Sequence, residues 1–175
     1  PQDMPTLCKE LSAIVNKNQS IVSVAAGIKY KSLKNSLPTD KIFRAMPNVG
    51  AKDNLGITAI FSHSDNSEVL RIFNFLGEAY EVENEDQIDL HTVLIGSGPA
   101  FFYELLSEFE RRMDILVQDK DIKRLISIIF LSSLITSIKN GENLDDLIES
   151  VASKGGTTEA GLNFLYKEKF NEIFS

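Results

Sequence analysis

The sequence predicts an α/β segment followed by an all-helical segment. In the first half, short, β-branched and nearly all-apolar runs alternate with helical patterns, as is typical of strands buried on both faces of a parallel sheet. This alternation is the rhythm of a doubly wound α/β fold. From Glu85 onward, apolar residues recur only at helical spacing. We therefore divide the chain into residues 1–83 and residues 84–175.

Composition limits the possible functions. The 175 residues are 43% hydrophobic and 25% charged, as in ordinary soluble globular proteins with one domain or two small ones. A net charge of −7 argues against general nucleic-acid binding, which needs a basic face. With one cysteine and two histidines, neither an internal disulfide nor a metal site is expected. No signal peptide or membrane span is predicted, so we expect a cytoplasmic protein.

The first half is predicted to contain four strands and three helices. Asp3 is placed to cap the first helix, whose apolar residues begin at Leu7, and Gly27 is expected to end the first strand. The expected strands cover Ser20–Ala26, Lys41–Met46, Leu55–Ser62 and Glu78–Val82, and the later helices cover Ile28–Leu37 and Asp65–Leu76. Six acidic residues between Glu78 and Asp89 are interpreted as a solvated loop and helix start.

The second half is predicted to consist of helices. One ends near Ile95, the next begins at Pro99, and a third begins at Asp121. The third is apolar nearly all round, and a half-chain of roughly 90 residues has little room to cover it, so we expect burial in a dimer. Lys139-Asn140-Gly141 is expected to end this helix. Three shorter helices are expected over Asn143–Val151, Thr158–Tyr166 and Glu168–Phe174.

Two glycine-rich segments at expected helix starts carry the main functional signal. Gly96-Ser97-Gly98 reads as a turn before Pro99, which suits the first position of a helix. Gly155-Gly156 precedes Thr157, a good N-cap residue. Uncovered N–H groups at a helix start favour a carboxylate or phosphate. Each segment alone also fits ordinary capping, but the pair favours a small carboxylate held between two helix N-termini.

Other polar side chains leave alternatives open. Arg44, next to a strand end, could hold a phosphate or pair with a local carboxylate. Asn48 follows a strand end, where ligands bind in open α/β sheets, but it equally suits a turn. Lys154 could bind a carboxylate directly or lie on the surface. His63 and His91 are isolated in the sequence, and we interpret both as structural or solvent-facing.

Three motifs follow one another along the chain: Arg44-Ala45-Met46-Pro47-Asn48, then Gly96-Ser97-Gly98-Pro99-Ala100-Phe101, then Gly155-Gly156-Thr157-Thr158 with Gly161-Leu162. Together with Val24–Ile28, they resemble the motifs of pyrroline-5-carboxylate reductases over essentially the whole chain. The resemblance implies that residues 1–83 are a partial nucleotide-binding α/β domain, the remnant of a doubly wound sheet. It implies that residues 84–175 form a helical substrate-binding and dimerisation domain.

The resemblance also implies an oxidoreductase of proline biosynthesis. Hydride would pass from NADPH or NADH to the imine carbon of pyrroline-5-carboxylate, giving L-proline. No acid–base residue is required if the imine binds protonated, so catalysis would rest on positioning and electrostatics. The nicotinamide would lie beside Ala25, Ala26, Gly27, Met46, Pro47 and Asn48. The substrate would be lined by Ser97, Gly98, Pro99, Gly155, Gly156, Thr157 and Thr158, in a homodimer or higher oligomer.

The sequence also departs from the family pattern. The glycine-rich loop that cradles the cofactor pyrophosphate is absent from these 175 residues, which would leave an open edge strand. Val49-Gly50 replaces the usual Thr-Pro, and Lys154 replaces a proline. We therefore expect the isolated chain to be inactive and to bind NADPH very weakly, although a carboxylate such as proline still binds.

Two further interpretations were weighed. In the first, the chain is a non-catalytic, reductase-like protein with a dimerisation or regulatory role. In the second, it resembles 3-hydroxyacid dehydrogenases, which we disfavour because no lysine lies in a suitable catalytic motif. The choice between NADPH and NADH stays open.

Overall fold

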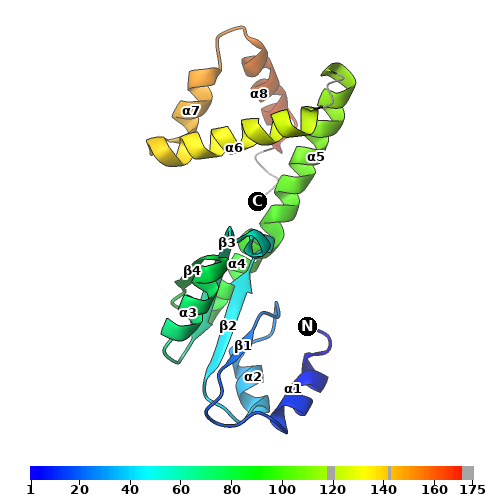
Figure 1. Ribbon diagram of the computed structural model, residues 1–175. Helices are drawn as coiled ribbons and strands as arrows, with labels where there is room; N and C mark the ends of the chain where they lie inside the picture. The colour runs from blue at the N-terminus through cyan, green and yellow to red at the C-terminus, as the bar shows by residue number, and fades with distance from the viewer. Residues whose placement is uncertain (118–120, 142, 171–175) are drawn as a thin grey trace. The chain divides into compact units, whose positions relative to one another are not determined.

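The computed structural model describes residues 1–117, 121–141 and 143–170 (Figure 1). The chain forms two compact units, residues 1–105 and residues 106–175, which we describe separately. The first unit is a sheet with helices and the second is helical, in agreement with the predicted fold class. The first unit extends to Leu105 because two helical segments after Asn84 pack on the sheet.

The first unit is built on a four-stranded sheet in the order β1-β2-β3-β4 (Figure 1). The strands are β1 (Ile21–Ser23), β2 (Ile42–Pro47), β3 (Gly56–Ser62) and β4 (Gly77–Glu81). All four predicted strands are present, but the sheet is mixed, because β2 and β3 are antiparallel. Only the short 3-10 helix η1 (Val49–Asp53) joins them, and a parallel crossover needs a dozen or more residues.

Six helical segments accompany the sheet: α1 (Met4–Ser12), α2 (Tyr30–Ser36), α3 (Ser67–Phe73), η2 (Asn74–Leu76), α4 (Glu85–His91) and η3 (Thr92–Ser97). Asp3 occupies the N-cap position of α1 as predicted, although its side chain makes no capping hydrogen bond there. Gly27 has φ +74°, a conformation that glycine adopts without strain. The strand predicted to run up to Gly27 ends earlier, at Ser23, and Gly27 lies in the turn that follows.

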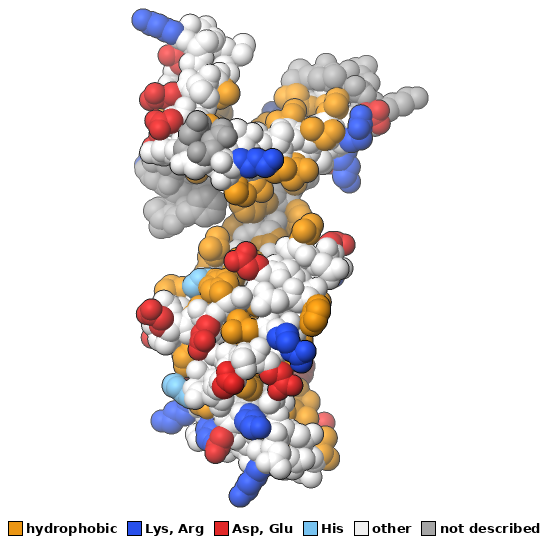
Figure 2. Space-filling model, turned by 60° about the vertical axis from the view of Figure 1, so that its left-hand side comes forward, with side chains coloured by type: hydrophobic (Ala, Val, Ile, Leu, Met, Phe, Trp, Pro, Cys, Tyr) orange, Lys and Arg blue, Asp and Glu red, His pale blue; other side chains and the backbone are white. Residues whose placement is uncertain are grey.

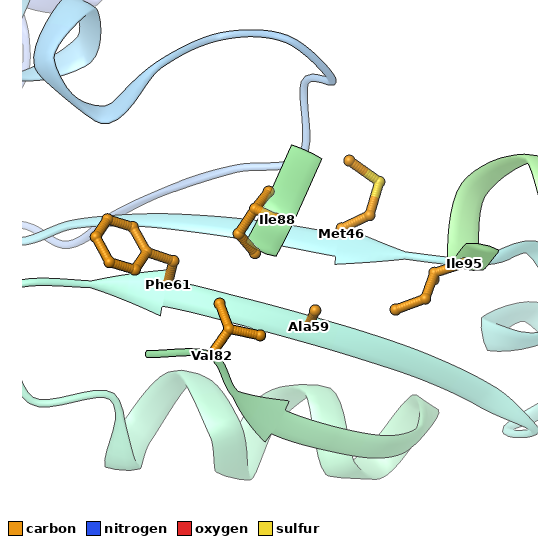
Figure 3. Packing of buried hydrophobic residues seen from close by; sticks show 6 residues of the cluster. All are labelled: Met46, Ala59, Phe61, Val82, Ile88 and Ile95. Carbon is orange, nitrogen blue, oxygen red and sulfur yellow. The ribbon is translucent and has the colours of Figure 1, made fainter. Parts of the chain in front are cut away.

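Side chains alternate between the two faces of β2. Phe43 and Ala45 face α3 and contact Val69 in a buried cluster. Met46 points to the opposite face, where it packs with Ile88 of α4 and Ile95 of η3 (Figure 3). The sheet is therefore covered on both faces by helices of its own unit.

The chain runs from α4 through η3 into α5 (Gly98–Val117) without a turn. The predicted glycine turn at Gly96-Ser97-Gly98 is therefore wrong, since η3 is a π-helix and Gly98 has helical angles of φ −49° and ψ −44°. Pro99 cannot donate the backbone hydrogen bond of an ordinary helix interior. The extra residue of a π-helical turn accommodates such a break without ending the helix.

The second unit contains the rest of α5 and three further helices: α6 (Ile122–Asn140), α7 (Leu144–Val151) and α8 (Thr157–Lys167). Gly141 ends α6 in the left-handed conformation, φ +59°, as predicted. Asn143 caps α7 by accepting the N–H of Asp145. Of the helix predicted over residues 168–174, Glu168 and Lys169 lie in a turn, and the part from residue 171 lies outside the described residues.

Apolar side chains remain open to solvent on the second unit (Figure 2). Among the described side chains of α6 only Ile126 is buried, and Ile122 and Phe130, one turn away on either side, are half-buried. Seven other large apolar residues of α6 are exposed. The exposed ones are Leu125, Ile128, Ile129, Leu131, Leu134, Ile135 and Ile138. We call these seven residues the α6 apolar surface. The helix is apolar on most of its sides as predicted, and no described residue covers the α6 apolar surface.

Candidate functional site

Two of the predicted site segments leave the sheet at the same edge. Strands β1 and β2 are parallel, with Ser23 opposite Arg44. Ala25–Gly27 follows β1, and Met46–Asn48 comprises the last two residues of β2 and the residue after it. Both segments therefore lie at the carboxyl ends of the strands. In open α/β sheets this edge is where ligands bind.

The helical segment η3 packs on this edge. Ala26 contacts the buried cluster that contains Met46 and Ile95. A Cβ atom added to Gly96 would lie 3.7 Å from Met46 Sδ, an ordinary van der Waals distance. The structure thus brings together three segments that the sequence placed far apart. The side chains that these segments pack together are the apolar Ala26, Met46 and Ile95, which we call the apolar floor. Ser97 is exposed and Gly98 is buried.

Arg44 is the most deeply buried charge in the described chain, with 1% of its surface exposed. It lies on the same face of β2 as Ile42 and Met46, so its side chain points towards α4. Its Nη1 is 2.8 Å from Glu85 Oε1, and its Nη2 is 2.9 Å from Asp89 Oδ1. Arg44 therefore pairs with local carboxylates, which decides between the two alternatives left open by the sequence.

The same carboxylates bind the segment that follows the β1 turn. Lys29 Nζ lies 2.6 Å from Asp89 Oδ2 and 3.2 Å from Asp86 Oδ1, and the N–H of Tyr30 donates to Glu85. The hydrogen bond from Lys29, assisted by Arg44, holds the pKa of Asp89 below its ordinary value. We call Lys29, Arg44, Glu85, Asp86 and Asp89 the ion cluster.

Sequence reasoning missed the ion cluster. The acidic run was interpreted as solvated, yet Glu85 and Asp89 turn towards the sheet. One signal was available. Glu85 and Asp89 lie four residues apart, on one face of a predicted helix, and Arg44 lies in a strand predicted to be buried. A buried arginine requires carboxylate partners.

Asn48 has a structural role in the loop after β2. Its Oδ1 accepts the N–H of Ile57 at 3.2 Å, and Asn48 is the N-cap residue of η1. Two residues on, a Cβ added to Gly50 would lie 2.7 Å from the carbonyl oxygen of Leu55. The departure at Val49-Gly50 therefore has a steric reason, because this loop geometry admits only glycine at position 50.

The second glycine segment belongs to the helical unit, and its capping differs from the prediction. Gly156, not Thr157, is the N-cap residue of α8. The reason is that Glu159 folds back, and its Oε2 accepts the N–H of Gly155 at 2.6 Å. The N–H of Gly156 donates to the carbonyl of Ser153. The first amides of α8, at Thr157, Thr158 and Glu159, have no partner inside the helix, since Ala160 is the first residue to donate to the carbonyl of Gly156.

The remaining candidates are structural or exposed. The ring of His63 packs edge-on against Tyr30 and Phe61, with ring centroids 4.7 and 5.1 Å apart. His91 Nδ1 lies 2.5 Å from the carbonyl oxygen of Gln87. Lys154 is exposed. The described residues hold no group of three or more His, Cys, Asp or Glu that could bind a metal ion. Nor does any helix within them have the length and apolar character to cross a membrane.

Comparison with known proteins adds independent evidence. Residues 85–175 match the family model described as pyrroline-5-carboxylate reductase dimerisation. The chain is 31% identical to the pyrroline-5-carboxylate reductase of Staphylococcus haemolyticus, over 99% of this chain and 66% of that protein. It is also 31% identical to pyrroline-5-carboxylate reductase 1 of Bacillus subtilis, over 100% of this chain and 61% of that protein.

A solved structure supports the fold. The crystal structure of the Plasmodium falciparum pyrroline carboxylate reductase with NADP bound aligns with a TM-score of 0.91. The alignment covers 98% of this chain and 71% of that one, at 22% sequence identity. The chain thus spans about two thirds or less of the length of the two curated relatives that it matches.

Proposed function

Because the chain belongs to the pyrroline-5-carboxylate reductase family, we propose that it carries the nicotinamide-facing and substrate-facing segments of such a reductase. The reaction would be hydride transfer from NADPH or NADH to the imine carbon of pyrroline-5-carboxylate, giving L-proline. The observation that carries the proposal is the meeting of Ala26, Met46 and η3 at the carboxyl edge of the sheet.

We assign the nicotinamide to the apolar floor at this edge. An apolar floor with exposed backbone groups suits a flat aromatic ring. The residues that would contact it are Ala25, Ala26, Gly27, Met46, Pro47 and Asn48. The Plasmodium falciparum relative holds NADP, which supports a nicotinamide dinucleotide as the cofactor of this family member.

The substrate-facing residues of the first unit are Ser97, Gly98 and Pro99. Ser97 is exposed and follows the buried Ile95 by two residues, and the π-helical turn changes the pairing of the backbone around it. In the second unit we assign Gly155, Gly156, Thr157 and Thr158 to a carboxylate. The amides of Thr157 and Thr158 are the donors for it, since Glu159 and Ser153 already use the two glycine amides.

The chemistry follows from the residue types. Hydride would form a C–H bond at the imine carbon, and the C=N π electrons would move to nitrogen and neutralise a protonated imine. The segments Ala25–Gly27, Met46–Asn48 and Gly96–Pro99 contain no Asp, Glu, His, Lys or Arg. We therefore propose no acid–base residue, and we assign catalysis to positioning in a site with an apolar floor.

Calorimetric titration tests the proposal on the chain itself. We expect L-proline to bind, with its carboxylate as the recognised group. We expect NADPH to bind very weakly, because no glycine-rich pyrophosphate loop occurs in these 175 residues, and steady-state reduction of pyrroline-5-carboxylate to be undetectable. Micromolar NADPH binding would show that these 175 residues bind the cofactor without a glycine-rich loop, and absence of proline binding would contradict the substrate assignment.

A second candidate function is a non-catalytic dimerisation module. The α6 apolar surface favours it, and residues 85–175 match a dimerisation family. We propose a homodimer or higher oligomer formed through the helical unit. Analytical ultracentrifugation tests oligomer formation, while proline binding separates the two candidates, because a module with no substrate role has no reason to bind proline.

A further inference from the structure

We infer that Arg44 is a positioning residue that holds η3 against the carboxyl edge of the sheet. The part of this inference that concerns a ligand rests on the proposed function. The guanidinium of Arg44 binds Glu85 and Asp89, so Arg44 would act on the site through the carboxylates of α4. The ion cluster lies beside the three site segments of the first unit and contacts the elements that carry each of them.

The first link runs from β2 to η3. Arg44 lies two residues before Met46 on the same strand and on the same face. Its guanidinium binds Glu85 and Asp89, which stand one helical turn apart on α4. Because α4 continues into η3 without a turn, a shift of α4 at Asp89 displaces Thr92–Ser97 with it.

The second link joins the segment after β1 to α4. Lys29 and Tyr30 lie two and three residues after Gly27, and they bind Asp89, Asp86 and Glu85. The carboxylates of α4 therefore hold both strand-end segments at once. The guanidinium of Arg44 binds Glu85 and Asp89 through two different nitrogens held in one plane. A lysine at this position would offer one nitrogen, a point charge without that fixed fork.

Stability alone does not explain this arrangement. Replacing a buried ion pair by well-packed apolar groups is often neutral or even stabilising. What two directed ion pairs add is a fixed distance and angle between β2 and α4. The inference therefore predicts a local effect on η3, not a uniform loosening of the first unit.

Hydrogen exchange measured on the whole chain separates the two effects. In Arg44→Met we expect the amides of residues 93–98 to exchange roughly tenfold faster, while those of β4 (Gly77–Glu81) change much less. Arg44→Lys keeps the charge but not the planar fork. The amides of residues 93–98 should therefore still exchange faster in Arg44→Lys than in the unaltered chain. Lys34→Met removes an exposed ion pair with Asp40 in the same unit and should change neither region.

The results that overturn the inference are equally defined. Equal acceleration in β4 and in residues 93–98, unchanged exchange in both, or full protection in Arg44→Lys would each leave Arg44 without a positioning role. If Arg44→Met does not fold, Asp89→Asn replaces it, because the pair between Arg44 and Glu85 survives there. In that variant we expect a few-fold acceleration confined to residues 93–98, and a uniform change overturns the inference.

L-proline binding adds a functional readout. At a temperature where every variant is folded by circular dichroism, Arg44→Met should weaken the Kd for L-proline several-fold, and Lys34→Met should not. Unchanged affinity in Arg44→Met would confine the ion cluster to a structural role. If the unaltered chain fails to bind L-proline, the proposed function fails, but the exchange experiment still decides whether Arg44 positions η3.

Discussion

The two units differ in how far their apolar side chains are buried. In the first unit, Met46, Ile60 and Ile88 are buried by strands and helices of the same unit. In the second unit, the α6 apolar surface stays exposed, and only Ile126 of that helix is buried. The difference teaches that the first unit has the contacts to fold on its own chain, whereas the second has a surface that a partner would cover.

The largest expected effect lies in the first unit. Gly77 has φ +138°, and an added Cβ would lie 2.0 Å from the carbonyl oxygen of Gly56. Gly77→Ala should therefore unfold the sheet or cost on the order of 4 kcal/mol. Gly141→Ala is the matched control, because φ there is also positive but the Cβ meets nothing within 4 Å. Urea denaturation followed by circular dichroism measures both, and similar losses would refute the steric explanation.

The next largest effect is expected at the proposed dimer interface of the second unit. Leu134 is 59% exposed on α6, and Leu134→Glu would place a charge in any partner-covered surface. The cost should be about 3 kcal/mol, which weakens dimerisation on the order of 100-fold. Arg124→Glu introduces the same charge on the same helix at a polar position. Sedimentation of the two variants checks the prediction, and an unchanged dimer in Leu134→Glu would place the interface elsewhere.

A smaller effect is expected from the buried arginine. Glu85 and Asp89 keep 24% and 35% of their side-chain surface exposed, so water partly compensates them when Arg44 is lost. Arg44→Met should cost about 2 kcal/mol, less than the loss of a partner in a fully buried pair. A fall in the urea midpoint without a change in slope measures this cost. A midpoint equal to that of Lys34→Met would mean that the burial of Arg44 adds nothing.

The smallest effect concerns pH. The pKa of Asp89 is held below its ordinary value of 3.8 by Lys29 and then Arg44, so the unfolded chain takes up a proton there before the folded chain does. This stabilisation is complete above about pH 4 and is lost as the pH falls through the lowered pKa. Urea midpoints measured from pH 5 to pH 2.5 should fall less in Asp89→Asn than in the unaltered chain. Parallel curves would show that Asp89 is not the group responsible.

Local patterns predicted most of the elements. The four strands, the end of α6 at Gly141 and the start of α7 after Asn143 all appear where the residues indicated. Each of these features depends on residues within one or two turns. The antiparallel pairing of β2 with β3 was missed, although the short connection between Pro47 and Gly56 is readable in the sequence.

The motifs nominate the residues of the candidate site, which stay predictions, but they do not determine its local geometry. The motifs named Met46, Gly98 and Thr157, yet two of the three local structures assigned to these motifs were wrong. Gly98 lies inside a continuous helical path, and Thr157 follows its N-cap instead of forming it. In both cases a neighbour decided the outcome: Pro99 favours a π-helical turn, and Glu159 takes the amide of Gly155.

By itself, the sequence determined the order of elements, the change from α/β to all-helical, and the three motifs of a reductase family. These depend on residue spacing, which acts over a few residues along the chain. Only the tertiary structure decided that Arg44 binds Glu85 and Asp89, which are 41 and 45 residues away. A buried guanidinium selects its partners by distance in space, so its role emerges only when β2 and α4 pack together.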